Sequence, residues 1–455
     1  MVRSPKRVRA LDVWMNGEHV GTWSPNRSGV PVFEYEAQWL RSPRCRALSL
    51  SLPLLPGNQP HRGEHVTWWF DNLLPDSRII RERVRTRFRL DSLDPFALLS
   101  AIGRDCVGAV QLVPAGTDPG DVRRIDAERL AEHDVARLLR HVTTSQLLSD
   151  EPVGEEFRIS IAGAQEKTAL LWRENEWYRP FGATPTTHLL KLPLGRVGNF
   201  NADLRDSVEN EWLCMQLLGE LGLPVPRTEM VRFRDDRGDV KALAVERFDR
   251  QVTHDESTNA PWIVRIPQED VCQSTGTPPS RKYESDGGPT LHQCLELLRA
   301  GAAPDADMLT FVNAQLAFWL LAAPDGHAKN FSIFLQRDGY VMTPLYDVMS
   351  AWPIIGPGPN EWAYRDATLA MALRGSRPYR HLHRIAMRHW RALAERTGVP
   401  HAFDAMQQLV ANADAALARV EARLPADFPP LVWERIAAGV RTQATRFLMG
   451  SEASA

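Results

Sequence analysis

Apolar residues along this 455-residue chain follow two different spacings. Between residues 10 and 115, short apolar stretches alternate with polar turns, a pattern typical of strands. The longer stretch from Val66 to Phe88 has a helical spacing that Pro75 should break into two pieces. Beyond Leu291, apolar residues recur at i, i+3 and i+4, which predicts helices for most of the remaining chain. The sequence therefore predicts an α+β protein with a β-rich first half and a mainly helical second half.

Changes in composition divide the chain into four expected units, 1–115, 116–156, 157–250 and 251–455. The first is a β-rich N-terminal subdomain, and the second is a charged linker that is helical around Ala127 to Leu139. The third is a β-rich lobe and the fourth is a mainly helical lobe. Within the fourth, the polar segment from Ser274 to Pro289 is too rich in Gly, Pro and Ser to favour burial. We interpret it as a mobile loop near a substrate cleft, or as a passive surface excursion.

Two β-rich stretches, 331–335 and 340–345, flank Asp338-Gly339. An Asp-Gly pair between such stretches is a strong local signal for a two-residue type I′ turn. The pattern therefore predicts a tight hairpin centred on these two residues.

That register would place Asn330 directly across from Asp347, at the open end of the hairpin. Asp325 lies just upstream of it, after an apolar segment from Met308 to Leu321 that we expect to be a buried helix. An Asp and an Asn five positions apart, followed by a second Asp, form the pattern that protein kinases use for a catalytic base and two Mg²⁺ ligands. Phosphoryl transfer is the leading hypothesis, and an ordinary hairpin with capping Asp and Asn side chains is the alternative.

A phosphotransferase also needs a cation for the nucleotide phosphates. Lys191 is a lone cation in an apolar stretch, 187–193, that is predicted to be a strand. The next predicted helix, 206–221, carries Glu209 and Glu211 near its start. A pair between Lys191 and Glu211 would resemble the kinase device for holding phosphates. A strand-edge lysine and a glutamate in a first helical turn explain the same residues equally well.

Upstream, residues 157–171 have the pattern of a strand, a turn of small residues and a second strand. Small residues let backbone amides approach phosphate oxygens closely. Only one glycine is present, so the stretch matches neither a G-x-G-x-x-G nor a Walker A motif. Taken alone, it is a weak signal for a phosphate loop.

The composition excludes some classes of protein. Lys and Arg number 54 against 56 Asp and Glu, a formal charge of −2, so there is no overall bias toward nucleic acid. Five cysteines without C-x-x-C spacing are expected to be reduced core residues. We find neither a signal peptide pattern nor an apolar stretch long enough to span a bilayer, and therefore expect a cytoplasmic protein.

Several motifs together resemble the HipA family of bacterial type II toxin kinases. The motifs near the expected site are SIAGAQEKTALL (160–171), TTHLLKLP (186–193), ALAVERFDR (242–250), DGHAKNFSIF (325–334) and PLYDVMSA (344–351). Further matches are WMNGEHVG (14–21), LSLSLPL (48–54), FDNLLPDS (70–77), IGRDCVGAV (102–110), RIPQEDVCQ (265–273), KYESDGGP (282–289) and LPADFP (424–429). The resemblance covers nearly the whole chain. It implies a bilobal protein-kinase-like fold, with a nucleotide-binding lobe at 157–250 and the catalytic loop and metal site in 251–455.

The resemblance also implies roles for individual residues. Asp325 would be the catalytic base, Asn330 and Asp347 would hold Mg²⁺, and Lys191 would contact the phosphates of ATP. The phosphate loop would consist of Ala162, Gly163, Ala164, Gln165, Glu166 and Lys167. Glu246 and Phe248 would form the hinge around adenine, and His327, Lys329, Asn330 and Tyr346 would complete the nucleotide site.

Regulation and partners are implied in the same way. Ser160 matches the family's autophosphorylation position, and a phosphate there, which adds roughly −1.5 to −2 charges, would repel ATP. Family members phosphorylate an aminoacyl-tRNA synthetase, best known as glutamyl-tRNA synthetase, and thereby arrest growth. They also bind operator DNA together with a helix-turn-helix antitoxin, HipB. Arg377 and Arg380 occupy the stretch that touches DNA in the family, although a solvated helix face is the alternative explanation.

Two other functions compete with a serine/threonine kinase toxin. A small-molecule kinase of the same fold would share the metal and nucleotide residues. A catalytically inactive subunit that only assists repression would not need Asp325, Asn330, Asp347 and Lys191, all of which are present.

Overall fold

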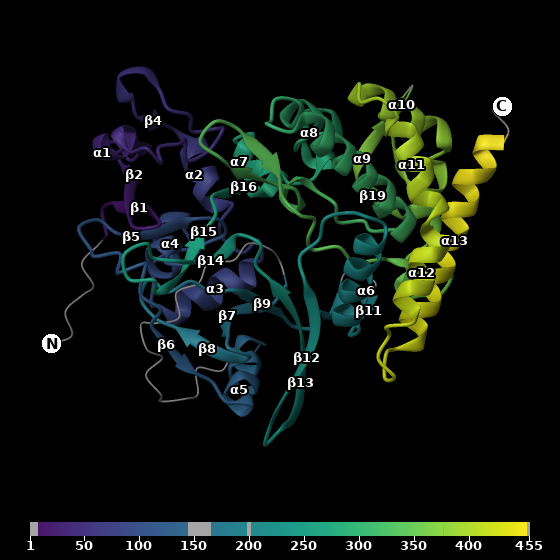
Figure 1. Ribbon diagram of the computed structural model, residues 1–455, viewed down its shortest axis with the longest axis horizontal. Coiled ribbons are helices and arrows are strands. Elements are labelled where there is room, and N and C mark those ends of the chain that lie inside the picture. The colour runs from purple at the N-terminus through teal and green to yellow at the C-terminus, as the bar shows by residue number, and fades with distance from the viewer. Residues whose placement is uncertain (1–7, 144–164, 198–201, 376, 453–455) are drawn as a thin grey trace.

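The structure is a computed structural model that describes residues 8–143, 165–197, 202–375 and 377–452. In Figure 1 the N-terminal strands and a central sheet lie at the left, and the C-terminal helices lie at the right. This distribution confirms the predicted α+β class with strands first and helices last. All five cysteines are free and four of them are buried, as expected.

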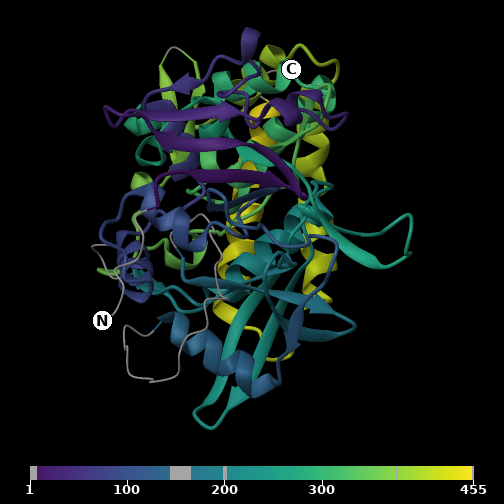
Figure 2. The same ribbon diagram turned by 90° about the vertical axis from the view of Figure 1, so that its left-hand side faces the viewer.

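The N-terminal region is a five-stranded antiparallel sheet with helices on it, in the strand order β4-β3-β2-β1-β5. Its strands are β1 (Leu11–Met15), β2 (Glu18–Pro25), β3 (Pro31–Tyr35), β4 (His61–Arg62) and β5 (Val110–Pro114), and its helices are α1 (Ala37–Arg41), α2 (Glu64–Asp71), α3 (Arg78–Arg87) and α4 (Pro95–Ile102). The predicted break at Pro75 is confirmed, because it lies between α2 and α3. Trp23 of β2 stacks on Phe70 of α2 with ring centroids 4.1 Å apart, which joins the sheet to its helices. The sheet crosses the top of Figure 2.

The central sheet has six antiparallel strands in the order β12-β13-β9-β7-β8-β6. These are β6 (Ala127–Arg129), β7 (Lys167–Arg173), β8 (Glu176–Pro180), β9 (His188–Lys191), β12 (Thr228–Asp235) and β13 (Gly238–Glu246). Helices α5 (Glu132–Thr143) and α6 (Ser207–Glu220) pack against it, and β10 (Gly195–Val197) pairs with β11 (Ala202–Leu204) beside it. The hairpin of β12 and β13 extends beyond the rest of the sheet in Figures 1 and 2.

The helix expected around Ala127 to Leu139 starts later than predicted. Ala127 pairs with Pro180 as part of strand β6 at the sheet edge. The carboxylate of Asp134 accepts the amide of Ala131 at 3.1 Å, and helix α5 begins directly afterwards. The first residues of the expected helix therefore pair with β8 as the edge strand of the sheet. A local cap sets the start of the helix.

Short strands connect the sheet to the helical region. β14 (Arg250–His254) and β15 (Pro261–Arg265) form one hairpin, and β16 (Gln268–Asp270), β17 (Ser332–Leu335) and β18 (Tyr340–Met342) form a three-stranded sheet. The predicted hairpin between 331 and 345 therefore exists, but its predicted register is wrong. Leu335 pairs with Tyr340, and the turn is centred on Arg337 and Asp338, so Asn330 is not directly across from Asp347.

Gly339 explains the shifted turn. It does not adopt the positive φ that a type I′ turn centred on Asp338 and Gly339 requires. A Cβ on Gly339 would instead lie 3.2 Å from the Cβ of Ala302. The glycine therefore allows close packing against residues 301–302, a long-range contact that the Asp-Gly signal does not report.

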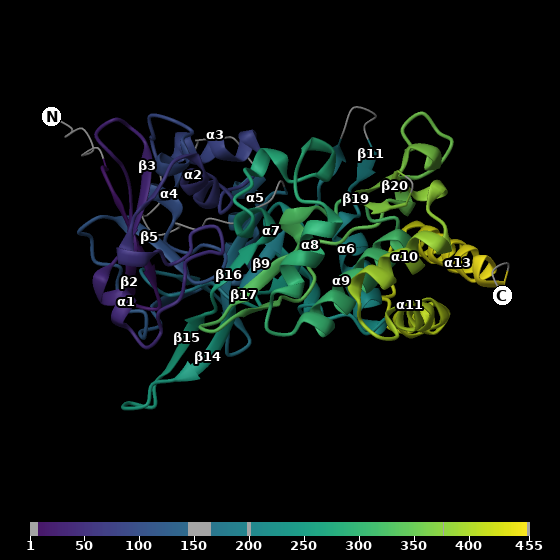
Figure 3. The same ribbon diagram turned by 90° about the horizontal axis from the view of Figure 1, so that it is seen from above.

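The C-terminal region is mainly helical. It contains α7 (Val271–Ser274), α8 (Leu291–Arg299), α9 (Pro304–Leu321), α10 (Met387–Thr397), α11 (Ala402–Ala411), α12 (Ala413–Glu421) and α13 (Pro430–Glu452), with one hairpin of β19 (Thr368–Arg374) and β20 (Pro378–His381). Nearly the whole surface of α9 from Met308 onward is buried, which confirms the predicted core helix. α13 lies outermost in Figure 3. No helix in the described ranges is long and apolar enough to cross a membrane.

Candidate active site

A cleft of about 1040 Å³, including space open to solvent, lies where the central sheet, the N-terminal region and the helical region meet. The structure brings together ten of the residues singled out from the sequence, which line this cleft: Lys167, Lys191, Glu246, Phe248, Asp325, His327, Lys329, Asn330, Tyr346 and Asp347. Gln165 and Glu166 lie outside the lining and are bonded to Leu192 and Arg83, respectively. Ser160, Ala162, Gly163 and Ala164 lie outside the described residues.

Lys191 lies on β9 with its side chain almost fully buried. Its Nζ is 2.5 Å from Oε1 of Glu211 on α6 and 2.7 Å from Oδ1 of Asp347. The predicted pairing of a strand lysine with a helix glutamate is therefore present. Burial alone would lower the pKa of Lys191, but Asp347 and Glu211 outweigh it and raise that pKa above its ordinary value. Lys191 thus carries a permanent charge in the cleft.

A second lysine faces the first. Lys167 on β7 is the direct cross-strand partner of Lys191 on β9. Like charges in this position destabilise a sheet unless anions lie between them. Burial lowers the pKa of Lys167, while the nearby carboxylate of Asp347 opposes that shift. Two lysines and two carboxylates, those of Glu211 and Asp347, therefore lie together at this end of the cleft.

Asn330 and Asp347 supply oxygen donors beside these lysines. Asn330 donates its side-chain N–H to the carbonyl of Asp325 at 2.6 Å, and within the described chain its Oδ1 accepts no hydrogen bond. Asp347 has a left-handed φ of 62°. Burial disfavours its carboxylate, but Lys191 and Lys167 outweigh burial and hold the pKa of Asp347 well below its ordinary value. One amide oxygen and one ionised carboxylate are the kind of hard ligands that Mg²⁺ takes from protein.

No set of three or more His, Cys, Asp or Glu side chains forms a metal cage in the described ranges. A cation at Asn330 and Asp347 would therefore complete its shell with phosphate oxygens and water, as Mg²⁺ commonly does. The donor set fits magnesium in that form.

Asp325 follows α9 in the loop that leads to β17, and half of its side chain is exposed. The hydroxyl of Tyr283 donates a hydrogen bond to its Oδ1. Desolvation and the charge of Asp347 raise the pKa of Asp325, and the bond from Tyr283 opposes them. His327 is buried, and desolvation and Lys282 lower its pKa to about 3, so its imidazole is neutral at pH 7. Asp325 is thus an accessible carboxylate with a raised pKa, a combination that suits a group that accepts a proton.

Lys329 directs its ammonium away from the other site lysines. Its Nζ donates to the carbonyl and Oδ1 of Asn72, at 2.8 and 2.9 Å, and to Oδ2 of Asp270 at 3.0 Å. The Tyr346 hydroxyl donates to the carbonyl of Lys329 at 2.8 Å. Asn72 comes from the N-terminal region, which therefore contacts the loop between α9 and β17 directly. Sequence reasoning gave no role to Asn72 or Asp270, although both lie in motifs that resemble the family.

The segment from Ser274 to Pro289 is not a solvated excursion. Glu284 is buried, and its Oε2 accepts the amide of Ala372 at 2.7 Å. The preceding Lys282 forms an ion pair with Asp76 at 2.8 Å. Although the segment is rich in Gly, Pro and Ser, three consecutive residues with long side chains, Lys282, Tyr283 and Glu284, bind distant parts of the chain.

Glu246 and Phe248 lie at the far side of the cleft, where β13 ends. The Phe248 ring lies 5.8 Å from the ring of Tyr346 and 5.7 Å from that of Phe334. Glu246, the last residue of β13, is exposed and lines the cleft. An apolar ring beside exposed backbone is the type of surface on which a flat base can bind.

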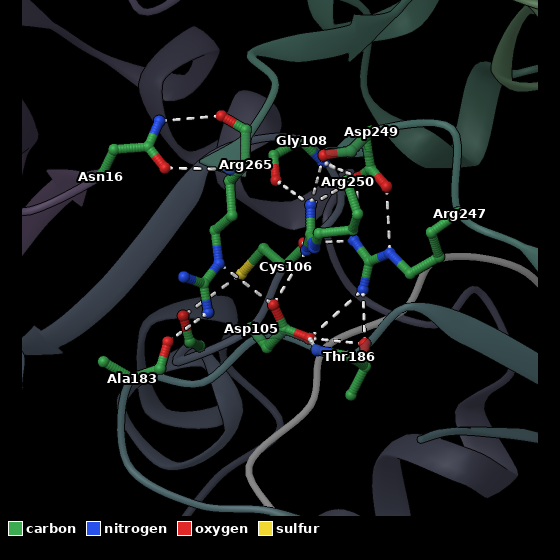
Figure 4. A network of polar contacts seen from close by, with 11 residues as sticks. Asn16, Asp105, Cys106, Gly108, Ala183, Thr186, Arg247, Asp249, Arg250 and Arg265 are labelled. Carbon is green, nitrogen blue, oxygen red and sulfur yellow. Dashed lines mark hydrogen bonds and ion pairs between the residues drawn. The ribbon is translucent and has the colours of Figure 1, made fainter. Parts of the chain in front are cut away.

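A buried ion network surrounds Asp105 next to these residues of the chain (Figure 4). Asp105 of the N-terminal region contacts three guanidinium groups, those of Arg250 at 2.8 Å and of Arg247 and Arg265 at 3.3 Å. Burial alone would raise the pKa of Asp105, but these arginines outweigh it and hold that pKa far below its ordinary value. Asp249 pairs with Arg247 at 2.8 Å and accepts the amide of Gly108 at 2.7 Å. Arg247 and Asp249 flank Phe248 in the sequence, so the network fixes the backbone on both sides of that residue.

Arg377 and Arg380 lie on the hairpin of β19 and β20, apart from the cleft. Arg380 is 3.4 Å from Oε1 of Glu284, and the guanidinium of Arg377 lies 5.4 Å from the ring centre of Tyr379. Arg380 is therefore already engaged by a buried carboxylate.

Two domain families match most of this chain. The HipA N-terminal domain matches residues 11–113, and the HipA-like C-terminal domain matches residues 159–418. This chain belongs to the HipA family. The family predicted from the sequence motifs is thus confirmed.

Individual relatives agree with the family. A protein of Sinorhizobium fredii named "Putative kinase Y4mE" is 35% identical over 77% of this chain and 80% of its own length. The serine/threonine-protein kinase toxin HipA of Shewanella oneidensis is 27% identical over 66% of both chains. The solved structure of Shewanella oneidensis HipA with HipB and operator DNA has a TM-score of 0.77, with 22% identity over 97% of this chain and 98% of that one. The predicted fold and the predicted enzyme class, a HipA-family kinase, are confirmed.

Proposed function

We propose that this chain transfers the γ-phosphate of ATP to a serine or threonine hydroxyl of a protein. The observation that carries the proposal is the convergence of Lys191, Asp347, Asn330 and Asp325 in one cleft. The ionised carboxylate of Asp347 and the open oxygen of Asn330 would hold Mg²⁺. The facing ammonium groups of Lys167 and Lys191 would bind the triphosphate. Magnesium and nucleotide, when bound, would supply charge neutralisation and the phosphoryl group.

Asp325 would accept the proton of the attacking hydroxyl. Its exposed carboxylate can reach a substrate, and its raised pKa favours proton uptake in the transition state. Glu246 and Phe248 would hold the adenine, and His327, Lys329 and Tyr346 would shape the floor of the site. Gln165 and Glu166, with Ala162, Gly163 and Ala164, would close over the phosphates, and Ser160 would be the site of self-modification.

The relatives support a proposal for the biological role. A relative is named a kinase toxin, and the solved relative is assembled with HipB and operator DNA. We infer a toxin that phosphorylates an aminoacyl-tRNA synthetase, with glutamyl-tRNA synthetase the first candidate, and that a HipB-like antitoxin neutralises. Growth arrest and persistence would follow from the block of translation. Operator DNA would be reached through the antitoxin complex, and Arg377 is better placed than Arg380 for a direct contact, because Glu284 already binds Arg380.

The test is phosphoproteomics of a bacterial lysate treated with the purified chain, ATP and MgCl₂. We expect a new phosphoserine on an aminoacyl-tRNA synthetase, absent with Asp325→Asn. Asp338→Asn is the matched control, because Asp338 is 91% exposed at the tip of a hairpin, and it should act like the wild type. Phosphate that is transferred only to small molecules, with no new phosphoprotein, would overturn the protein-kinase assignment.

A further inference from the structure

Tyr283 is docked on the loop that carries Asp325. Its hydroxyl donates to Oδ1 of Asp325, and its ring meets His327 edge-on with centroids 4.8 Å apart and planes at 85°. The amide of Ala328 donates to the carbonyl of Lys282 at 3.2 Å. Side-chain, ring and backbone contacts therefore join two segments that are about forty residues apart in the chain.

The residues on either side of Tyr283 are anchored to different regions. Lys282 pairs with Asp76 of the N-terminal region, and both side chains are about 15% exposed. Glu284, whose side chain is 3% exposed, accepts the amide of Ala372 and lies 3.2 Å from Arg374 of β19. Held from both sides, the Tyr283 ring has little freedom to leave Asp325. Such rigidity is what a site needs to fix a reacting group within a fraction of an ångström.

A carboxylate that acts as a base needs one oxygen directed at the substrate hydroxyl. Tyr283 takes Oδ1 of Asp325 and leaves Oδ2 for that purpose. We infer that Tyr283 is a positioning residue for Asp325, which it orients through its hydroxyl so that the second oxygen faces the acceptor. This inference rests on the proposed role of Asp325 as base.

The role has a signature in the kinetic constants. A side chain that only orients the base leaves the binding of ATP unchanged and slows the chemical step, so its loss lowers kcat and not the affinity for ATP. Its effect also depends on the carboxylate that it orients. Once Asp325 is replaced by Asn, the Tyr283 hydroxyl has no carboxylate to orient, and its removal should lower kcat no further.

The experiment compares Tyr283→Phe with the wild type by kcat and by KM for ATP, and makes the same substitution in Asp325→Asn. In the wild-type background we expect kcat to fall about ten-fold, a part of the 10²–10⁴ that a general base contributes, while KM for ATP stays constant. In the Asp325→Asn background we expect no further fall in kcat. Tyr340→Phe is the control, because the hydroxyl of Tyr340 donates to the carbonyl of Leu297 away from the site, and it should leave kcat unchanged.

A Tyr283→Phe enzyme with unchanged or higher kcat, or one whose kcat falls by the same factor in the Asp325→Asn background, would overturn the inference. If the wild type transfers no phosphate, the proposed function fails, yet a crystal structure of Tyr283→Phe still shows whether Asp325 keeps its orientation. An Asp325 carboxylate that lies in the same position in both proteins would contradict the inference on its own.

Discussion

The buried ion network centred on Asp105 should be necessary for the stability of the fold. Asp105→Asn keeps the shape of the side chain but removes the charge that faces Arg247, Arg250 and Arg265. Arg247 and Arg250 would then keep only their pairs with Asp249, and Arg265 would lose the carboxylate that it contacts. Removing one partner of a buried ion pair typically costs about 3–5 kcal/mol, because the remaining charge is left uncompensated. A loss of this size is a large part of the total stability of about 5–15 kcal/mol expected of a domain.

The assay is urea unfolding followed by tryptophan fluorescence, together with hydrogen exchange of residues 103–109 and 246–250. We expect an earlier unfolding transition and faster exchange in both segments, since the network joins them. Asp203→Asn is the matched control, because the partner of Asp203, Arg205, is 70% exposed and water screens the pair. A variant at Asp105 that unfolds at the same urea concentration as the wild type would refute the reasoning, since three buried contacts would then contribute nothing.

Three further outcomes are expected. Asp325→Asn should lower kcat at least about 100-fold with little change in the unfolding midpoint, measured by phosphate transfer and urea unfolding; near-normal kcat would rule out Asp325 as the base. Lys329→Met should lower the thermal midpoint, because Asp270 then keeps a buried charge without its cation; an unchanged midpoint would show that the bridge is not needed. Burial raises the pKa of Glu269 to about 7 in the folded protein, whereas the unfolded chain loses this proton at its ordinary, lower pKa. The free energy of unfolding of the wild type should therefore fall as the pH rises from 5 to 8. Glu269→Gln should lack this loss. Between pH 5 and pH 8, urea unfolding should therefore show the free energy of unfolding of the variant rising by about 3 kcal/mol relative to that of the wild type. A difference between the two proteins that is the same at both pH values would contradict the shift.

Local sequence patterns predict the elements of this fold well. The helix at Met308 to Leu321, the break at Pro75 and the hairpin around Asp338 are all encoded within a few residues of themselves. Periodicity and proline chemistry act over that range. The hairpin register could not be predicted, because Gly339 is placed by a contact with Ala302.

The sequence predicted the residues that line the cleft, but not the residues that hold them in place. Lys191 was recognisable as a buried cation that needs a partner, and Glu211 follows it closely in the sequence. The partners of Lys329 and Lys282, Asn72 and Asp76, lie more than 200 residues away in the chain. No local spacing reports a contact of that kind, so the part of the N-terminal region in the site is seen only in three dimensions.

The central claim is that a magnesium-bound triphosphate sits among Asp325, Asn330, Asp347 and Lys191. A crystal structure with Mg²⁺ and a non-hydrolysable ATP analogue tests it most directly. The account predicts a metal bound by Asn330 and Asp347, with phosphate oxygens next to Lys191 and the terminal phosphate facing Asp325. A nucleotide bound outside this cleft, or bound within it without contact to these four side chains, would contradict the account.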